Sequence, residues 1–215
     1  MREIKGIFFW LSGVFTQPYT AILAQALSQV CERPVNPFAL PNYKTQVEGL
    51  ITGRVDDLTF CQALCESARV KESPAALRDR VLEGVTPNPG AIAAARLLPP
   101  SIQRWLVVDL PQGWFERISG RLMVGACFTP EQMIYLPASR LPRLMPEVFY
   151  LLASQAHLSI QECLLIDASA RRAVQALKHD LSTELYVDNR RLERMFVMHG
   201  FIDRPQPVHK PANSL

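Results

Sequence analysis

The chain has 215 residues, of which 48% are apolar and 20% are charged. A chain of this size can bury one full core and hold a further subdomain. Its formal net charge is only +3, from 23 basic and 20 acidic residues, which argues against nucleic-acid binding. The densest basic cluster, at residues 189–194, carries its own acid, so we expect a solvated helix face there.

The sequence also predicts a cellular setting. The apolar run at residues 7–11 is too short for a secretory signal, and the sequence holds no run near the roughly 20 apolar residues of a membrane span. Five scattered cysteines fit reduced thiols, and the pair Cys61 and Cys65 indicates buried thiols rather than a metal site, because the histidines lie far away in sequence. We therefore expect a soluble, cytoplasmic protein without a membrane partner.

Short apolar runs predict the strands of a sheet. Three of them, at residues 4–10, 105–110 and 163–166, are mostly apolar, which suits parallel strands covered on both faces. Two further candidates lie at residues 133–136 and 184–187. Each run is four to seven residues long by the printed numbering, as expected for strands.

Helical patterns separate these strands. They lie at residues 91–98, 146–156 and 170–179. The stretch 146–156 begins with Pro and Glu, as a helix start does. The stretch 170–179 is amphipathic, and we expect Ala173, Val174 and Leu177 to form its buried face. Strands that alternate with helices predict an α/β protein with a doubly wound parallel sheet.

Residues 19–88 differ from the rest, since they contain helical patterns and no convincing strand. The expected helices span residues 21–30, 43–51, 58–68 and 74–82. We therefore predict a core formed by residues 1–18 and 89–203, with a helical bundle at 19–88 inserted after the first strand. The last residues, 204–215, hold three prolines and no periodicity, which predicts an extended or disordered tail.

Four stretches place small or polar residues at the ends of strands or in loops. Residues 9–16 read FWLSGVFT, and the second predicted strand runs through Val107 and Val108 to Asp109. Residues 143–149 read RLMPEVF, and residues 165–169 read LIDAS. Two turn signals belong to the helical insert: GLITGRV at 49–55 lies inside it, between two expected helices, and PNPG at 87–90 lies where the chain returns to the core.

These motifs, in this order, resemble those of the haloacid dehalogenase-like (HAD) hydrolases, in particular the subgroup with a helical cap after the first motif. The resemblance spans about residues 4–203 and implies a Rossmann-like core with an inserted helical-bundle cap. It also implies phosphoryl transfer with Mg²⁺. Six positions then form the expected site, and the family's usual residue is absent at most of them. They are Trp10, Ser12, Asp109, Arg143, Asp167 and Ala168.

The chemistry implied by the resemblance does not suit these residues. Trp10 stands where the family has its attacking aspartate, and an indole can neither attack phosphorus nor bind Mg²⁺. Ser12 replaces the proton-shuttling aspartate and is too weakly acidic without help. Ala168 replaces one of two paired acids, which leaves Asp167 and a carbonyl as poor ligands. We therefore expect no magnesium cofactor.

The remaining polar residues leave two interpretations open. An ionised Asp109 would repel a phosphate, whereas Arg143 could hold an anion in a bidentate manner. Because Asp109 and Asp167 are predicted at neighbouring strand ends, we favour an ion pair between Arg143 and one of them. For Trp10, we favour packing over a stacking platform for a ligand.

Three functions are consistent with this pattern. The favoured one is a HAD-like relative that has lost phosphatase activity, a pseudoenzyme that acts by binding or regulation through an unknown protein partner. The second is a hydrolase of altered mechanism that uses Asp109, Asp167 and Arg143 on a small anionic or phosphorylated substrate. The third is a sensor that closes on a small anion held by Arg143. The fold alone does not choose among them.

Overall fold

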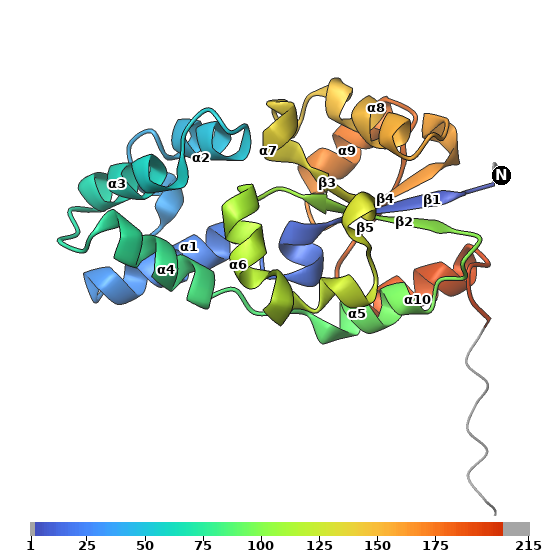
Figure 1. Ribbon diagram of the computed structural model, residues 1–215, viewed down its shortest axis with the longest axis horizontal. Coiled ribbons are helices and arrows are strands. Elements are labelled where there is room, and N and C mark those ends of the chain that lie inside the picture. Colours follow the sequence, from blue (N-terminus) through green and yellow to red (C-terminus); the bar gives the residue numbers. More distant parts are fainter. Residues whose placement is uncertain (1–2, 204–215) are drawn as a thin grey trace, which may run out of the picture.

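The computed structural model describes residues 3–203, so the tail predicted at 204–215 lies outside the described residues (Figure 1). Its centre is a five-stranded parallel sheet in the order β3-β2-β1-β4-β5. The strands are β1 (Gly6–Trp10), β2 (Gln103–Val108), β3 (Met133–Tyr135), β4 (Cys163–Asp167) and β5 (Ser182–Leu185). All five predicted strands are confirmed, with ends shifted by up to two residues.

Helices cover both faces of the sheet, which confirms the doubly wound α/β fold (Figure 1). One face carries α7 (Leu136–Ser139), α8 (Pro146–Gln155) and α9 (Ala170–Lys178). The other carries α5 (Pro89–Arg96), α6 (Gln112–Leu122) and α10 (Asn189–Met198). Successive side chains of β1 therefore enter different cores: Phe9 packs with the α5–α10 side, and Phe8 and Trp10 with the α8–α9 side.

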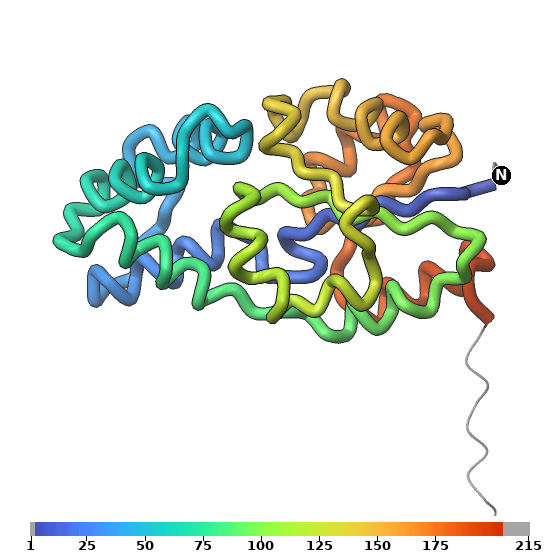
Figure 2. Tube along the Cα trace, viewed as in Figure 1, coloured from blue at the N-terminus to red at the C-terminus, as the bar shows by residue number. Residues whose placement is uncertain are grey.

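The segment 19–88 folds into four α-helices and a short 3₁₀ turn. These are α1 (Tyr19–Cys31), η2 (Pro37–Ala39), α2 (Tyr43–Ile51), α3 (Asp57–Ala68) and α4 (Pro74–Glu83). Asp56 caps α3 by accepting from the backbone N–H of Thr59, and Ser73 caps α4 just before Pro74. The chain leaves β1, runs through these helices beyond the carboxyl end of the strand, and returns to the sheet at α5 (Figure 2).

The two chain segments that connect this helical bundle to the sheet lie side by side. Thr16 and Pro87 form an isolated bridge, and the backbone N–H of Asn88 donates to the carbonyl of Phe15 at 2.8 Å. The side chain of Asn88 donates to the carbonyl of Val14 at 2.8 Å and to the hydroxyl of Tyr186 at 2.7 Å. Asn88 also caps α5, so one residue fixes the return of the chain to the sheet.

Of the three residues predicted for the buried face of α9, Ala173 is buried and the other two are not. Val174 is 51% exposed and Leu177 is 56% exposed. The residues that face the protein are instead Arg172, Ala173 and Ala176. The helix is rotated relative to the prediction because Arg172 is drawn inward by a buried partner at the end of β4.

The cysteines agree with the expectation of reduced, buried thiols. All five are free, and Cys61 and Cys65 lie buried on α3. Burial raises the pKa of the Cys61 thiol to about 12. A search of the helices within residues 3–203 finds none with the length and apolarity needed to cross a membrane.

The role of Asn88 leads to a first prediction. Replacing Asn88 with Ala removes a helix cap and the side-chain hydrogen bonds that join the two connecting segments. The free energy of unfolding should fall by about 2–4 kcal/mol, as measured by urea denaturation. Ser73→Ala is the matched control, because this exposed cap accepts one hydrogen bond and its loss should cost only about 1 kcal/mol. Equal losses for the two variants would contradict the role assigned to Asn88.

Candidate functional site

The turn after β1 brings the first site residues to the end of the sheet. Gly13 has a φ of 95°, which favours glycine, and a Cβ built there would lie 2.7 Å from the Cβ of Ala168. The hydroxyl oxygen of Ser12 accepts from the backbone N–H of Tyr19 at 2.9 Å. Ser12 therefore fastens the start of α1 to the turn, a structural role that needs no acid.

Trp10 is packed away from solvent. Its side chain is fully buried among the residues that join the sheet to α8 and α9. The guanidinium carbon of Arg172 lies 4.0 Å from the centre of its ring, which is a cation–π contact. Its indole N–H has no hydrogen-bond partner among the described residues. The packing interpretation of Trp10 therefore fits its surroundings better than a ligand platform does.

Asp167 at the end of β4 is bound by the first turn of α9. Arg172 donates to both of its carboxylate oxygens, from Nε to Oδ2 at 2.5 Å and from Nη2 to Oδ1 at 2.8 Å. The backbone N–H of Ser169 donates to Oδ1 at 2.8 Å. The Asp167 side chain is fully buried and the Arg172 side chain is 10% exposed. This bidentate ion pair is therefore internal to the protein.

Arg143, in the loop before α8, pairs with Asp109 just beyond β2. Its Nη1 donates to Oδ2 of Asp109 at 3.0 Å, and the Asp109 side chain is only 1% exposed. The other oxygen of Asp109 is buried without a partner among the described residues. The sequence predicted an ion pair between Arg143 and either Asp109 or Asp167, and the structure selects Asp109.

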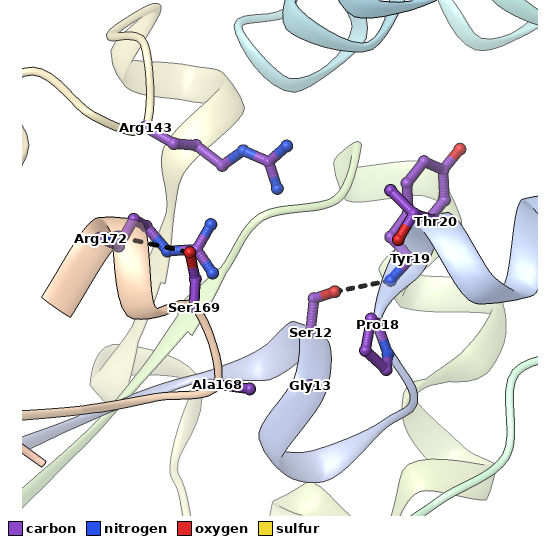
Figure 3. Close-up of a pocket in the computed structure, with 9 residues that line it drawn as sticks. All are labelled: Ser12, Gly13, Pro18, Tyr19, Thr20, Arg143, Ala168, Ser169 and Arg172. Atoms are coloured by element: carbon purple, nitrogen blue, oxygen red, sulfur yellow. Dashed lines mark hydrogen bonds between the residues drawn. The ribbon is translucent and has the colours of Figure 1, made fainter. Parts of the chain in front are cut away.

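A pocket of about 210 Å³ lies beside these groups, at the junction of the turn after β1, the start of α1 and the start of α9 (Figure 3). Ser12 and Ala168 line it, and Arg143 and Arg172 lie along one side. Tyr19 stands across from them. None of the described residues that line the pocket is acidic. The six predicted positions thus gather at one end of the sheet, but Trp10, Asp109 and Asp167 lie behind the pocket wall.

Two tyrosine hydroxyls near this junction are buried without a partner among residues 3–203. They belong to Tyr19 on α1 and Tyr43 on α2. Burial raises the pKa of Tyr43 to about 12 and raises that of Tyr19 well above its usual value. The Arg143 guanidinium acts on both phenols in the opposite direction. These hydroxyls therefore remain protonated donors at neutral pH.

The residues at this site do not fit a magnesium ion. Mg²⁺ prefers several oxygen ligands in an octahedral arrangement. Trp10 and Ala168 supply no ligand oxygen from their side chains, and both oxygens of Asp167 already accept hydrogen bonds from Arg172. Within residues 3–203, no group of three or more His, Cys, Asp or Glu side chains is placed to hold a metal ion.

Sequence reasoning missed Arg172, the residue that binds Asp167. A signal for it was present in the sequence. Arg172 follows the capping residue Ser169 by three positions and so lies in the first turn of α9, where the helix dipole disfavours a cation. A basic residue in that position, five residues after an acid at a strand end, indicates a specific internal partner.

Solved structures of known proteins share this fold. No protein-family model matches the chain, and no curated protein matches it. Solved structures do match. A HAD family enzyme of Bacteroides thetaiotaomicron has a TM-score of 0.71 at 14% identity, over 86% of this chain and 95% of that one. A HAD-like family hydrolase predicted in Porphyromonas gingivalis has a TM-score of 0.69 at 14% identity, covering 91% and 98%.

A third solved structure broadens the comparison to a different chemistry. The L-2-haloacid dehalogenase of Xanthobacter autotrophicus, with chloropropionic acid covalently bound, has a TM-score of 0.64 at 16% identity, over 92% of this chain and 84% of that one. At these identities the likeness establishes the fold. The chain has the HAD-like fold, as the sequence motifs predicted, while its activity must be argued from its own residues.

The buried pair at Asp167 gives a second prediction. Replacing Arg172 with Met leaves the Asp167 carboxylate buried without its cation, which should lower the free energy of unfolding by about 3–5 kcal/mol. Arg171→Met is the matched control on the exposed neighbour and should change it by less than about 0.5 kcal/mol. Urea denaturation measures both. Similar stabilities for the two variants would show that Arg172 does not compensate Asp167.

Tyr43 gives a prediction on pH. Its pKa in the folded protein, about 12, lies above the usual value of 10, so the folded state holds this proton more tightly than the unfolded state. The stability that this adds is fully present below pH 10 and is lost as pH rises through 12. Tyr43→Phe removes the titrating group. Urea denaturation across this range should show the wild type losing stability relative to the variant, and parallel curves would contradict the assignment.

Proposed function

We propose that this chain is a HAD-fold protein that acts by binding or regulation, without the phosphoryl-transfer chemistry of the hydrolases that it resembles. One observation carries the proposal most directly. The position of the attacking aspartate holds Trp10, which is fully buried beneath the guanidinium of Arg172. An indole has no basic lone pair with which to attack a substrate, and Trp10 does not line the pocket.

The state of the two remaining carboxylates supports the same proposal. Asp167 is held by Arg172, and Asp109 is held by Arg143. Each carboxylate is thus paired with a cation, and neither lines the pocket. A general acid or base must reach the proton that it transfers, and neither of these two groups lines the space that a substrate would enter.

The alternative is a hydrolase of altered mechanism that uses Asp109, Asp167 and Arg143 on a small anionic or phosphorylated substrate. The unpartnered oxygen of Asp109 is the observation that favours it, because a buried carboxylate oxygen can accept a proton. The enzyme would then depend on Asp109, whereas the binding function would not. If the chain is a hydrolase, the wild type should turn over substrate and Asp109→Asn should abolish that turnover. If the chain acts by binding, neither protein should show turnover.

The surroundings of the site suggest where binding takes place. We propose that the helical segment 19–88 serves as a cap over the end of the sheet, since Tyr19 and Thr20 from α1 line the pocket there. The working surface would be this pocket and its mouth, open to a small anion or covered by a protein partner. A cytoplasmic location remains part of the proposal, supported by the five free cysteines.

A phosphatase assay tests the proposal. The purified protein with Mg²⁺ and a generic aryl phosphate should give no turnover above that of buffer, with an active HAD phosphatase as the positive control. Magnesium-dependent turnover that disappears in Arg143→Ala would refute the loss of activity. Since a contaminating phosphatase would survive this substitution, the variant also separates the protein's own activity from an impurity.

Restoring the missing acids tests the scaffold. The combined variant Trp10→Asp, Ser12→Asp and Ala168→Asp should still fail to bind Mg²⁺, because Arg172 occupies both oxygens of Asp167. Adding Arg172→Ala frees that carboxylate and should produce measurable Mg²⁺ binding by calorimetry. Tight Mg²⁺ binding by the triple variant alone would show that Arg172 does not block the position.

A further inference from the structure

We infer that the pocket beside Arg143 and Arg172 binds a small oxyanion without a divalent metal, and that the Arg172 guanidinium is the fixed cation of this site. The inference rests on the proposed function, because it assigns a ligand class to the same pocket. Its chemistry differs from metal-dependent phosphate binding in one respect. The positive charge belongs to the chain itself and is held by Asp167 and Trp10.

The wall of the pocket presents hydrogen-bond donors. Arg172 uses Nε and Nη2 on Asp167, and within residues 3–203 the two N–H groups of its Nη1 have no partner. Arg143 uses only Nη1 on Asp109, so its Nε and Nη2 have no partner in the same part of the chain. Both guanidinium groups lie on the same side of the pocket (Figure 3). A ligand that only accepts hydrogen bonds and carries negative charge fits this wall.

The turn after β1 adds a neutral donor. Ser12 lines the pocket, and its hydroxyl oxygen accepts from the backbone N–H of Tyr19. Its own proton therefore remains available to a ligand. The Tyr19 hydroxyl does not contribute, because it is buried and directed away from the two arginines (Figure 3). The donors thus come from the turn, from α9 and from the loop before α8.

Charge and size define the ligand class. The two cations face the pocket while their carboxylates, Asp109 and Asp167, lie behind them, so each ion pair presents its positive end. The pocket volume of about 210 Å³ corresponds to roughly seven water molecules of liquid volume. This space suits inorganic phosphate, sulfate or a short carboxylate. These ions share one chemistry, a compact oxyanion, and binding experiments separate them.

The mode of holding Arg172 explains why no metal is required. A long basic side chain normally loses rotamer freedom when it orders around a ligand. Arg172 is already ordered by two hydrogen bonds to Asp167 and by the face of Trp10. The cation is therefore in place before a ligand arrives, as a preorganised binding group should be.

Isothermal titration of the full chain tests the inference, with inorganic phosphate, sulfate and acetate in separate arms. Each titration is run with EDTA and again with Mg²⁺. We expect at least one anion to bind with the same affinity in both conditions. Binding that requires Mg²⁺, or no binding of any of the three anions at tens of millimolar, would overturn the inference. Neither of these binding results measures phosphatase turnover, so the phosphatase assay tests the proposed function separately.

Two serine variants locate the bound anion. Ser12→Ala removes a hydroxyl that lines the pocket and should weaken anion binding about tenfold, the effect of one hydrogen bond to a charged group. Ser73→Ala is the matched control, because its hydroxyl also accepts from a backbone N–H at a helix start but lies outside the pocket lining. It should leave the affinity unchanged. Unchanged affinity in Ser12→Ala would contradict the assigned site.

The arginine is tested with a conservative change. Arg172→Lys keeps a cation near Asp167 but loses the forked geometry, and we expect anion affinity to fall about tenfold or more while the protein remains folded by circular dichroism. If this variant does not fold, the Ser12→Ala and Ser73→Ala pair still decides the matter. Unchanged anion binding in a folded Arg172→Lys protein would overturn the role of the guanidinium.

Discussion

The ion pair between Asp167 and Arg172, stacked on Trp10, organises the end of the sheet. A buried carboxylate without its cation would be costly, so Asp167 determines where the first turn of α9 must place Arg172. That requirement sets the rotation of α9, which buries Arg172, Ala173 and Ala176 and leaves Val174 and Leu177 at the surface. The guanidinium in turn gives the indole of Trp10 a charged partner in an otherwise apolar core.

This arrangement explains how several departures from the hydrolase motifs coexist in one stable structure. Each change taken alone would leave a gap or an uncompensated charge, but together they form a closed set of contacts. Trp10 fills volume, Arg172 balances Asp167, and Arg143 balances Asp109. Ser12 fastens α1 to the turn through the backbone N–H of Tyr19. The carboxyl end of the sheet is therefore organised by internal ion pairs, in a HAD-like fold that it shares with solved structures at 14–16% identity.

Much of the fold followed from local sequence pattern. The five strands were predicted because buried parallel strands are short, continuously apolar runs, and the helix starts at Pro74 and Pro146 because proline fits the first turn. Helix α6 was not predicted as an element, since its apolar residues are interrupted by Gly113 and Gly120, and packing against the helical bundle holds it in place. The six site positions were found by their places in the motifs, yet three of them lie behind the pocket wall.

The sequence by itself determined the α/β class, the order of its strands and helices, and the absence of the usual acids at positions 10, 12 and 168, because these depend on residue type and local periodicity. Tertiary structure alone decided which acid each arginine binds. Arg143 and Asp109 are 34 residues apart, and their pairing depends on how the loop before α8 crosses the end of β2. It also decided that Arg172 turns inward, since the desolvation of Asp167 exists only once the sheet has formed and excluded water.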